Sequence, residues 1–187
     1  MLISAEVLAS PQADAIVETK VGQDQLIAIL NVPTIQKELE LSNEQVAQIA
    51  VIKQAPFAVT FSEAIAPLKS ILTDKQLKEF KRTALPGLMV RAFLVAEVRD
   101  TLELTPEQMT SIAAIHAKLR TLLQPFQDKI NQGGSPKDYA EAMQLERDTA
   151  RFHEDAYVEA LELLTIVQRK KWEQIAKPLP LRNKKGG

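Results

Sequence analysis

The chain has 187 residues, of which 45% are hydrophobic and 25% charged, and its formal net charge is -1. This composition predicts a folded chain with one compact domain or two small subdomains. The balanced charge lacks the basic surface typical of duplex-binding proteins, so we expect no nucleic-acid partner. The absence of cysteine excludes disulfides, thiol nucleophiles and thiolate metal sites.

Residues 1–32 carry two short helical patterns and predict a peripheral N-terminal helical arm. Val7-Leu8-Ala9 resembles the small residues that a signal peptidase reads, but residues 1–9 contain Glu6 and no basic residue. They fit either the remnant of an export signal or an ordinary chain end. Both a periplasmic or otherwise exported location and a cytoplasmic one therefore stay open. No later stretch has the roughly 18 uncharged apolar residues that a spanning helix needs, so we expect no membrane span.

Residues 33–86 are predicted to form a first helical repeat. Its expected helices begin at Pro33, after Ser42, at Phe57 and after Thr73. Prolines should end or interrupt two of them, at Pro56 and Pro67. The last of these helices is expected to end near Thr83, and Pro86-Gly87 is the strongest internal boundary signal.

Residues 87–177 are predicted to form a second, longer helical repeat. The segment Leu88–Leu102 is so apolar that we expect one central helix there. Thr105 should begin a long helix with a kink at Pro125, and Gly133-Gly134 should turn the chain into a partner helix. A final helix follows Thr165, and residues 178–187 read as a flexible basic tail. The fold class is therefore all-α, an internally duplicated helical domain with a long C-terminal helical hairpin and no strands.

One pattern, Leu followed by Thr or Ser and then Gln three positions later, recurs four times. The hydroxyl at a helix start accepts a bond from the backbone N–H three residues on, and the Gln side chain reaches back to the N–H of the capping residue. The pattern therefore predicts four helix starts rather than a reaction centre. The predicted capping residues are Ser42 with Gln45, Thr73 with Gln76, Thr105 with Gln108, and Thr165 with Gln168.

The spacing of these patterns suggests an internal duplication. A shift of 104 − 41 = 63 positions places Leu41 on Leu104 and aligns eight identical residue pairs around it. The later copies lie 165 − 73 = 92 positions apart, so the second half has 92 − 63 = 29 additional residues, around the Gly133-Gly134 turn. Chance similarity of two amphipathic helix starts is the alternative. The preserved order of both motif types favours duplication.

These four windows resemble the LTxxQ-motif family of exported helical proteins, which includes Spy-like periplasmic chaperones and relatives in envelope stress and metal resistance. The resemblance is carried by Leu41, Leu72, Leu104 and Leu164 together with the capping residues that follow them. It implies an all-helical fold, export and a protein-binding or chaperone role. The chain differs from the Spy-like pattern in being longer, duplicated, near neutral and rich in proline.

The sequence offers little for catalysis or metal binding. Its only histidines are His116 and His153, and neither is preceded three positions earlier by the Glu of a di-iron motif. Phosphate-binding loops, nucleophile elbows and zinc-protease motifs are also missing. We therefore expect no enzyme, no cofactor and no metal site.

The leading functional hypothesis is a non-enzymatic helical binding protein, a Spy-like chaperone or envelope-stress protein that holds a protein client or partner. The alternative is a structural or assembly protein that homodimerises through the long hairpin, and a metal-responsive protein is third. Apolar side chains on the hairpin would form the partner-binding surface. The candidates are Phe126, Tyr139, Met143 and Tyr157.

Overall fold

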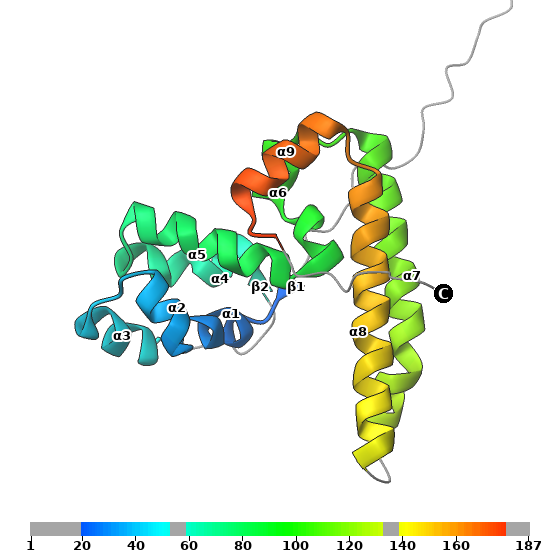
Figure 1. Cartoon of the computed structure of the whole chain (residues 1–187), viewed down its shortest axis with the longest axis horizontal. Coiled ribbons are helices and arrows are strands. Elements are labelled where there is room, and N and C mark those ends of the chain that lie inside the picture. The colour runs from blue at the N-terminus through cyan, green and yellow to red at the C-terminus, as the bar shows by residue number, and fades with distance from the viewer. Residues whose placement is uncertain (1–19, 53–58, 133–138, 179–187) are drawn as a thin grey trace, which may run out of the picture.

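The computed structural model describes residues 20–52, 59–132 and 139–178, and these are almost entirely helical (Figure 1). The predicted all-α fold is confirmed. Four predicted features lie outside the described residues. They are the segment Val7-Leu8-Ala9 that resembles a signal-peptidase site, the helix end expected at Pro56, the Gly133-Gly134 turn and the tail from residue 179. None of the helices in the described ranges is long and apolar enough to cross a lipid bilayer.

The first half of the chain contains short helices and one longer one. Pro33 occupies the first turn of its helix, and Ser42 and Thr73 are N-caps, as predicted. The elements are β1 (Lys20–Val21), α1 (Gln23–Leu30), α2 (Pro33–Glu38), α3 (Asn43–Ala50), β2 (Val59–Thr60), α4 (Phe61–Ile65), the 3-10 helix η1 (Ala66–Ser70) and α5 (Asp74–Gly87).

Two expectations about this half are wrong. A two-residue antiparallel ladder exists, in which β1 pairs Lys20 with Thr60 and Val21 with Val59, and β-branched residues favour such extended pairing. The described part of the expected arm is also not peripheral. Leu26, Ile27 and Leu30 of α1 are fully buried, and α1 packs against α4. Because the ladder ties the start of α1 beside α4, the arm contributes to the core.

The second half contains the longest helices. Its elements are the 3-10 helix η2 (Met89–Leu94), α6 (Ala96–Leu102), α7 (Pro106–Asn131), α8 (Tyr139–Glu162) and α9 (Ile166–Ile175). The single helix expected over Leu88–Leu102 is a wrong prediction, because Val95 is extended at φ −71° and ψ 129° and separates η2 from α6. The segment is nevertheless central, as its burial shows at Val90, Phe93 and Leu94.

Helix α5 runs past its expected end near Thr83 and stops at Gly87, so that Pro86 lies inside it. A proline inside a helix leaves the carbonyl four residues earlier without its partner. Here that carbonyl belongs to Arg82, and it accepts a bond of 2.8 Å from the backbone N–H of Lys177. The segment after α9 therefore satisfies the carbonyl that Pro86 frees, and it ties the C-terminal end of the described chain to α5.

An aromatic cluster joins η2, α8 and α9. The ring of Phe93 lies 5.9 Å from that of Tyr157 and 4.8 Å from that of Trp172, measured between centroids. The indole N–H of Trp172 donates to the hydroxyl of Tyr157 over 3.0 Å. All three side chains are buried, so the polar atoms of the cluster satisfy each other inside the core.

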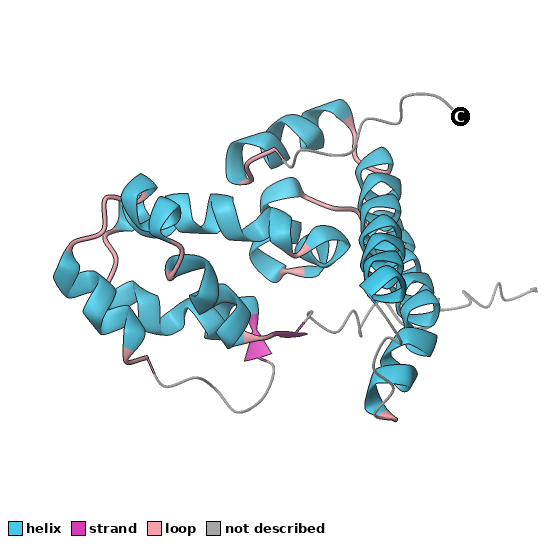
Figure 2. Ribbon diagram, turned by 60° about the horizontal axis from the view of Figure 1, so that its bottom comes forward, coloured by secondary structure: helices cyan, strands magenta, loops and turns pink. Residues whose placement is uncertain are grey.

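Helices α7 and α8 pack side by side as a hairpin, and the end of α7 and the start of α8 project away from the other helices (Figures 1 and 2). Helix α7 is continuous through Pro125, where a kink was expected. Burial stops part of the way along, at Leu119 on α7 and at Ala156 on α8. We call residues 120–131 and 139–155 the distal hairpin. No side chain that the structure describes within it is buried.

We predict that Phe93→Ala lowers the free energy of unfolding by about 3–5 kcal/mol, because it removes the ring shared by three elements and leaves a cavity. Tyr139→Ala is the matched control, since that aromatic side chain is 79% exposed. It should change stability by about 0.5 kcal/mol or less. Denaturant unfolding measures both, and similar losses in the two variants would contradict the assigned core.

Candidate functional site

All four predicted capping boxes are present. In the first, the hydroxyl of Ser42 accepts from the backbone N–H of Gln45 over 3.1 Å, and Gln45 Oε1 accepts from the N–H of Ser42 over 3.0 Å. The same two bonds join Thr73 to Gln76, Thr105 to Gln108, and Thr165 to Gln168. Each glutamine therefore has an amide NH2 group left over, which points beyond its own helix start.

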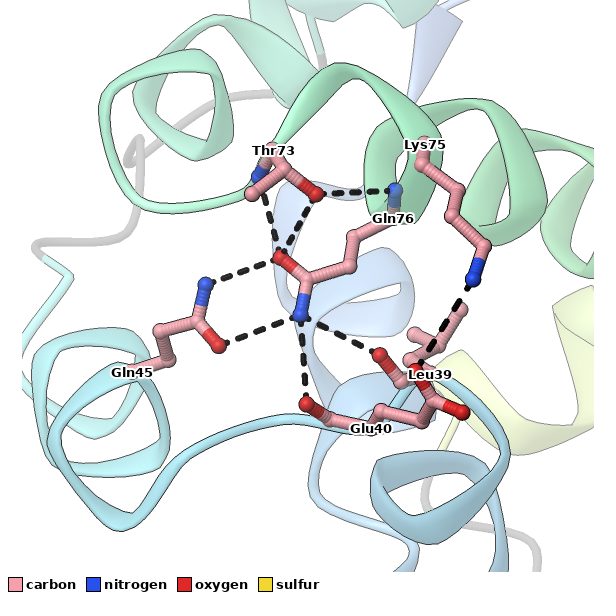
Figure 3. Close-up of polar contacts among 6 residues, drawn as sticks. All are labelled: Leu39, Glu40, Gln45, Thr73, Lys75 and Gln76. Atoms are coloured by element: carbon pink, nitrogen blue, oxygen red, sulfur yellow. Dashed lines mark hydrogen bonds and ion pairs between the residues drawn. The ribbon is translucent and has the colours of Figure 1, made fainter.

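In the first half, the remaining amide groups of Gln45 and Gln76 bind each other (Figure 3). Gln45 Nε2 donates to Gln76 Oε1 over 2.8 Å, and Gln76 Nε2 donates back to Gln45 Oε1 over 3.2 Å. Gln45 Nε2 also donates to the carbonyl of Ile71 at 2.8 Å, and Gln76 Nε2 to the carbonyls of Leu39 at 3.1 Å and Glu40 at 3.3 Å. We call this arrangement the first amide bridge. It ties the starts of α3 and α5 to the end of α2.

In the second half, Gln108 and Gln168 form an equivalent second amide bridge. Their reciprocal bonds measure 2.8 and 3.0 Å. Gln108 Nε2 also donates to the carbonyl of Leu163 at 2.8 Å, and Gln168 Nε2 to that of Glu103 at 3.3 Å. This bridge ties the starts of α7 and α9 to the end of α6.

Both bridges end on the same unusual backbone turn. Glu40 and Glu103 have positive φ angles of 52° and 54°, a left-handed conformation that costs a residue other than glycine roughly 1–2 kcal/mol. The following N–H groups, of Leu41 and Leu104, donate five residues back, to Gln36 and Arg99. This is the Schellman ending of a helix. In both halves a glutamine donates to the carbonyl of the left-handed residue, and in the first half Gln76 also donates to the preceding carbonyl, of Leu39.

Corresponding atoms of the two bridges are related by the offsets found in the sequence. Glu40 and Glu103 differ by 103 − 40 = 63 positions, and Ile71 and Leu163 differ by 163 − 71 = 92. This correspondence supports the internal duplication, which we retain as a proposal. It also indicates that the motif glutamines act in pairs rather than singly.

The bridges leave no bonding capacity for a ligand. An amide side chain offers two donors and two acceptor lone pairs. Gln168 uses both donors, on Glu103 and Gln108, and accepts from the backbone of Thr165 and from Gln108. Its exposure is only 8%. The repeated motif is therefore a structural cross-link, and a binding function must lie elsewhere on the helices it positions.

The predicted partner-binding residues do not share one environment. Tyr157 is a correction, because it is 3% exposed and packs in the aromatic cluster. The spacing of Tyr157 from the other apolar residues of α8 places it on the face that packs against the core, not on an exposed surface. Phe126 and Met143 are half-buried on the distal hairpin, where the ring of Phe126 lies 6.1 Å from that of Phe152. Tyr139 is 79% exposed.

The sequence analysis missed two polar features. Thr60 caps α4 in a box with Glu63, a pattern that the Thr-x-x-Glu spacing signals. Lys177 Nζ pairs with the carboxylates of Glu38 and Glu79, the latter at 3.0 Å. The hydrogen bond from Lys177 opposes burial and lowers the pKa of Glu79. Lys177 and Glu79 lie 177 − 79 = 98 positions apart, and Lys177 and Glu38 lie further apart still. No local sequence pattern could therefore predict these ion pairs.

Both histidines are half-buried on the hairpin, His116 on α7 and His153 on α8. Burial lowers the pKa of each ring, and the charge of Arg91 on η2 lowers both further. Across the described ranges, no three His, Asp or Glu side chains are grouped closely enough to hold a metal ion.

No protein-family model, curated protein or solved structure matches this chain. The resemblance to the LTxxQ-motif family therefore rests on the motif positions alone and stays a prediction.

We predict that Gln168→Ala lowers the free energy of unfolding by about 2 kcal/mol, because the Glu103 carbonyl loses its donor and the Gln108 amide loses its two bonds to Gln168. Gln124→Ala is the control, since that exposed glutamine bonds Asp128 on the same helix surface. It should cost about 0.5 kcal/mol or less.

A double-mutant cycle tests the pairing itself. Gln108→Ala combined with Gln168→Ala should cost at least about 0.5 kcal/mol less than the sum of the single variants. Strict additivity would mean that the two amides do not interact in solution.

We predict that stability falls as the pH drops below about 6.5, the ordinary histidine pKa. Because the folded state lowers both histidine pKa values, the unfolded chain binds more protons in this range, and acid favours unfolding. The free energy of unfolding should be constant above about pH 7.5 and smaller at pH 5.5. His116→Gln with His153→Gln should remove much of this difference, and an unchanged pH profile would contradict the assignment.

Proposed function

We propose that the chain is a non-enzymatic binding protein whose distal hairpin holds a protein client or partner. One observation carries the proposal: burial ends at Leu119 and Ala156, while both helices continue outward with apolar residues. A helix that extends beyond its own core keeps an apolar face only where another surface can cover it.

The apolar side chains of the distal hairpin are neither buried nor isolated. Tyr139 is 79% exposed and Leu122 42% exposed, and further large apolar side chains are partly covered. Those partly covered are Leu123, Phe126, Met143, Leu145 and Phe152. Contact with a partner would remove this remaining apolar surface from water, which is the main driving force for association.

Polar pairs lie on the same stretch of the two helices. Lys129 pairs with Glu141 across the two helices, and Gln124 and Gln144 bond Asp128 and Asp148 within them. The guanidinium of Arg151 lies 5.6 Å from the ring centre of Phe152. Apolar side chains together with paired polar groups are typical of a protein-protein interface. This combination of groups favours a protein partner over a strongly charged ligand.

The resemblance to the LTxxQ-motif family agrees with this function, since Spy-like members of that family are chaperones. We extend the proposal accordingly to an exported, periplasmic protein of envelope stress. Cell fractionation with an antibody against the chain tests the location, and recovery only with cytoplasmic markers would contradict it.

The same surface would suit a second copy of this chain, which makes a homodimer the alternative. Light scattering over a concentration range separates the two. A dimer whose dissociation is promoted by Leu122→Ser would favour assembly, whereas a monomer at every concentration would remove that alternative.

We predict that the purified protein suppresses aggregation of an unfolded client, and that Leu122→Ser with Phe126→Ser reduces this suppression several-fold. These residues lie four apart on one face of α7. The control is Val51→Ser with Val167→Ser, which removes two apolar side chains that are 77% and 64% exposed, the first just after α3 and the second on α9. Light scattering of the client follows the reaction.

Circular dichroism must show that both double variants stay folded. Absence of suppression by the wild-type protein at stoichiometric excess would rule out chaperone activity. Equal loss in both double variants would rule out the distal hairpin as the binding surface.

A further inference from the structure

A cavity of about 330 Å³ opens between α5, α6 and α9. Helix α9 packs against both of the other helices and so closes one side of it (Figure 1). The volume lies at the lower end of the range of about 300–1,000 Å³ that is typical of small-molecule sites. No residue of the distal hairpin lines this cavity, so it is separate from the surface proposed to bind a protein client.

The interior of the cavity is apolar. Leu85, Val95 and Val98 line it and are 4%, 1% and 1% exposed, so they form its floor. Leu77 on α5 and Ile175 on α9 also line it, and both are half-buried. Close packing normally fills the space between aliphatic side chains. A ligand with an apolar body would cover these side chains and remove them from water.

Helix α5 places apolar and basic side chains on the same side of the cavity. Its lining residues follow one another at alternating spacings of three and one, which places them on one face of the helix. They are Asp74, Leu77, Lys78, Lys81, Arg82 and Leu85. The three basic residues therefore lie beside the two leucines, in a position to hold a negative charge close to an apolar body.

Two of these basic residues already have partners. Lys81 Nζ lies 2.7 Å from the carboxylate of Glu97 and so joins α5 to α6 beside the cavity. Arg82 Nη1 donates to Glu79 over 2.9 Å. Lys78 is exposed and forms no hydrogen bond or ion pair with any residue in the described ranges. Among the described residues that line the cavity, Lys78 is thus the cation left to pair with a ligand.

We propose that this cavity binds a small monocarboxylate with an apolar chain, of the fatty-acid type. The chain lies over the floor of the cavity, and the carboxylate pairs with the ammonium group of Lys78 at the rim. Asp74 also lines the rim, in the first turn of α5, where the helix dipole favours its negative charge. Because Asp74 repels a second carboxylate, a dicarboxylate of the same chain length should bind more weakly.

The experiment titrates the full chain, labelled at its methyl groups, with sodium octanoate below its micelle concentration and follows the methyl resonances by NMR. We expect saturable shifts at Leu77, Val98 and Ile175, and no shifts at Leu122 and Leu123 of the distal hairpin. Octylammonium, which has the same chain with the opposite charge, and octanedioate should bind several-fold more weakly. Acetate, which has the charge without the chain, should produce no saturable shift.

Two variants test the two parts of the site. Lys78→Gln should weaken octanoate binding by about two- to five-fold, since an exposed ion pair contributes little. Its control is Lys75→Gln, which makes the same charge change on α5 at a lysine that does not line the cavity. Thr101→Phe places a ring at an exposed rim position of α6 and should abolish binding. The methyl spectrum itself shows whether each variant stays folded.

Absence of saturable octanoate shifts at Leu77, Val98 and Ile175 in the wild-type protein would overturn the proposal. Equal affinities for octanoate and octylammonium would do the same, as would shifts confined to the distal hairpin. The wild-type comparison does not depend on whether any variant folds. Failure of the hairpin to bind clients would leave these readouts unchanged, so the two proposals fail separately.

Discussion

The reciprocal bonding of paired glutamine amides is the interaction on which the arrangement of helices depends. A capping box alone satisfies the start of one helix. Here the glutamine side chain also bonds to the matching glutamine on another helix. In each pair one glutamine donates to the backbone carbonyl of a glutamate in the left-handed conformation. Three helix ends in each half are thereby fixed by two side chains whose donors and acceptors are fully used. Such complete satisfaction makes a polar bridge at the edge of a core stabilising rather than costly.

The second bridge also sets the direction of the hairpin. It fixes the starts of α7 and α9, and the aromatic cluster of Phe93, Tyr157 and Trp172 holds the base of α8 nearby. Beyond Leu119 on α7 and before Ala156 on α8, none of the side chains that the structure describes is buried. The molecule thus combines a rigid, cross-linked base with an arm that is stabilised by fewer contacts. We propose that the arm binds a protein partner.

The sequence predicted what is decided locally. Thr105 and Gln108 lie three positions apart, so their capping box follows from helix geometry alone. The pairing of Gln108 with Gln168 spans 60 positions and depends on where two helices meet. The break at Val95 and the continuation through Pro86 likewise follow from tertiary contacts, such as the bond from Lys177 to Arg82. Periodicity placed Tyr157 on the apolar face of α8, but only packing decides that this face is closed there.

Native-state hydrogen exchange of the backbone amides of Gln45, Gln76, Gln108 and Gln168 tests this account most directly. Amides in the first turn of a helix lack a carbonyl partner within that helix and normally exchange quickly. If the amide bridges hold the helix starts in solution, these four should exchange far more slowly, and those of Gln108 and Gln168 only through near-global unfolding. Amides of the distal hairpin should exchange through local opening at lower free energy. Fast exchange at the four glutamines, or equal protection along the whole hairpin, would contradict the account.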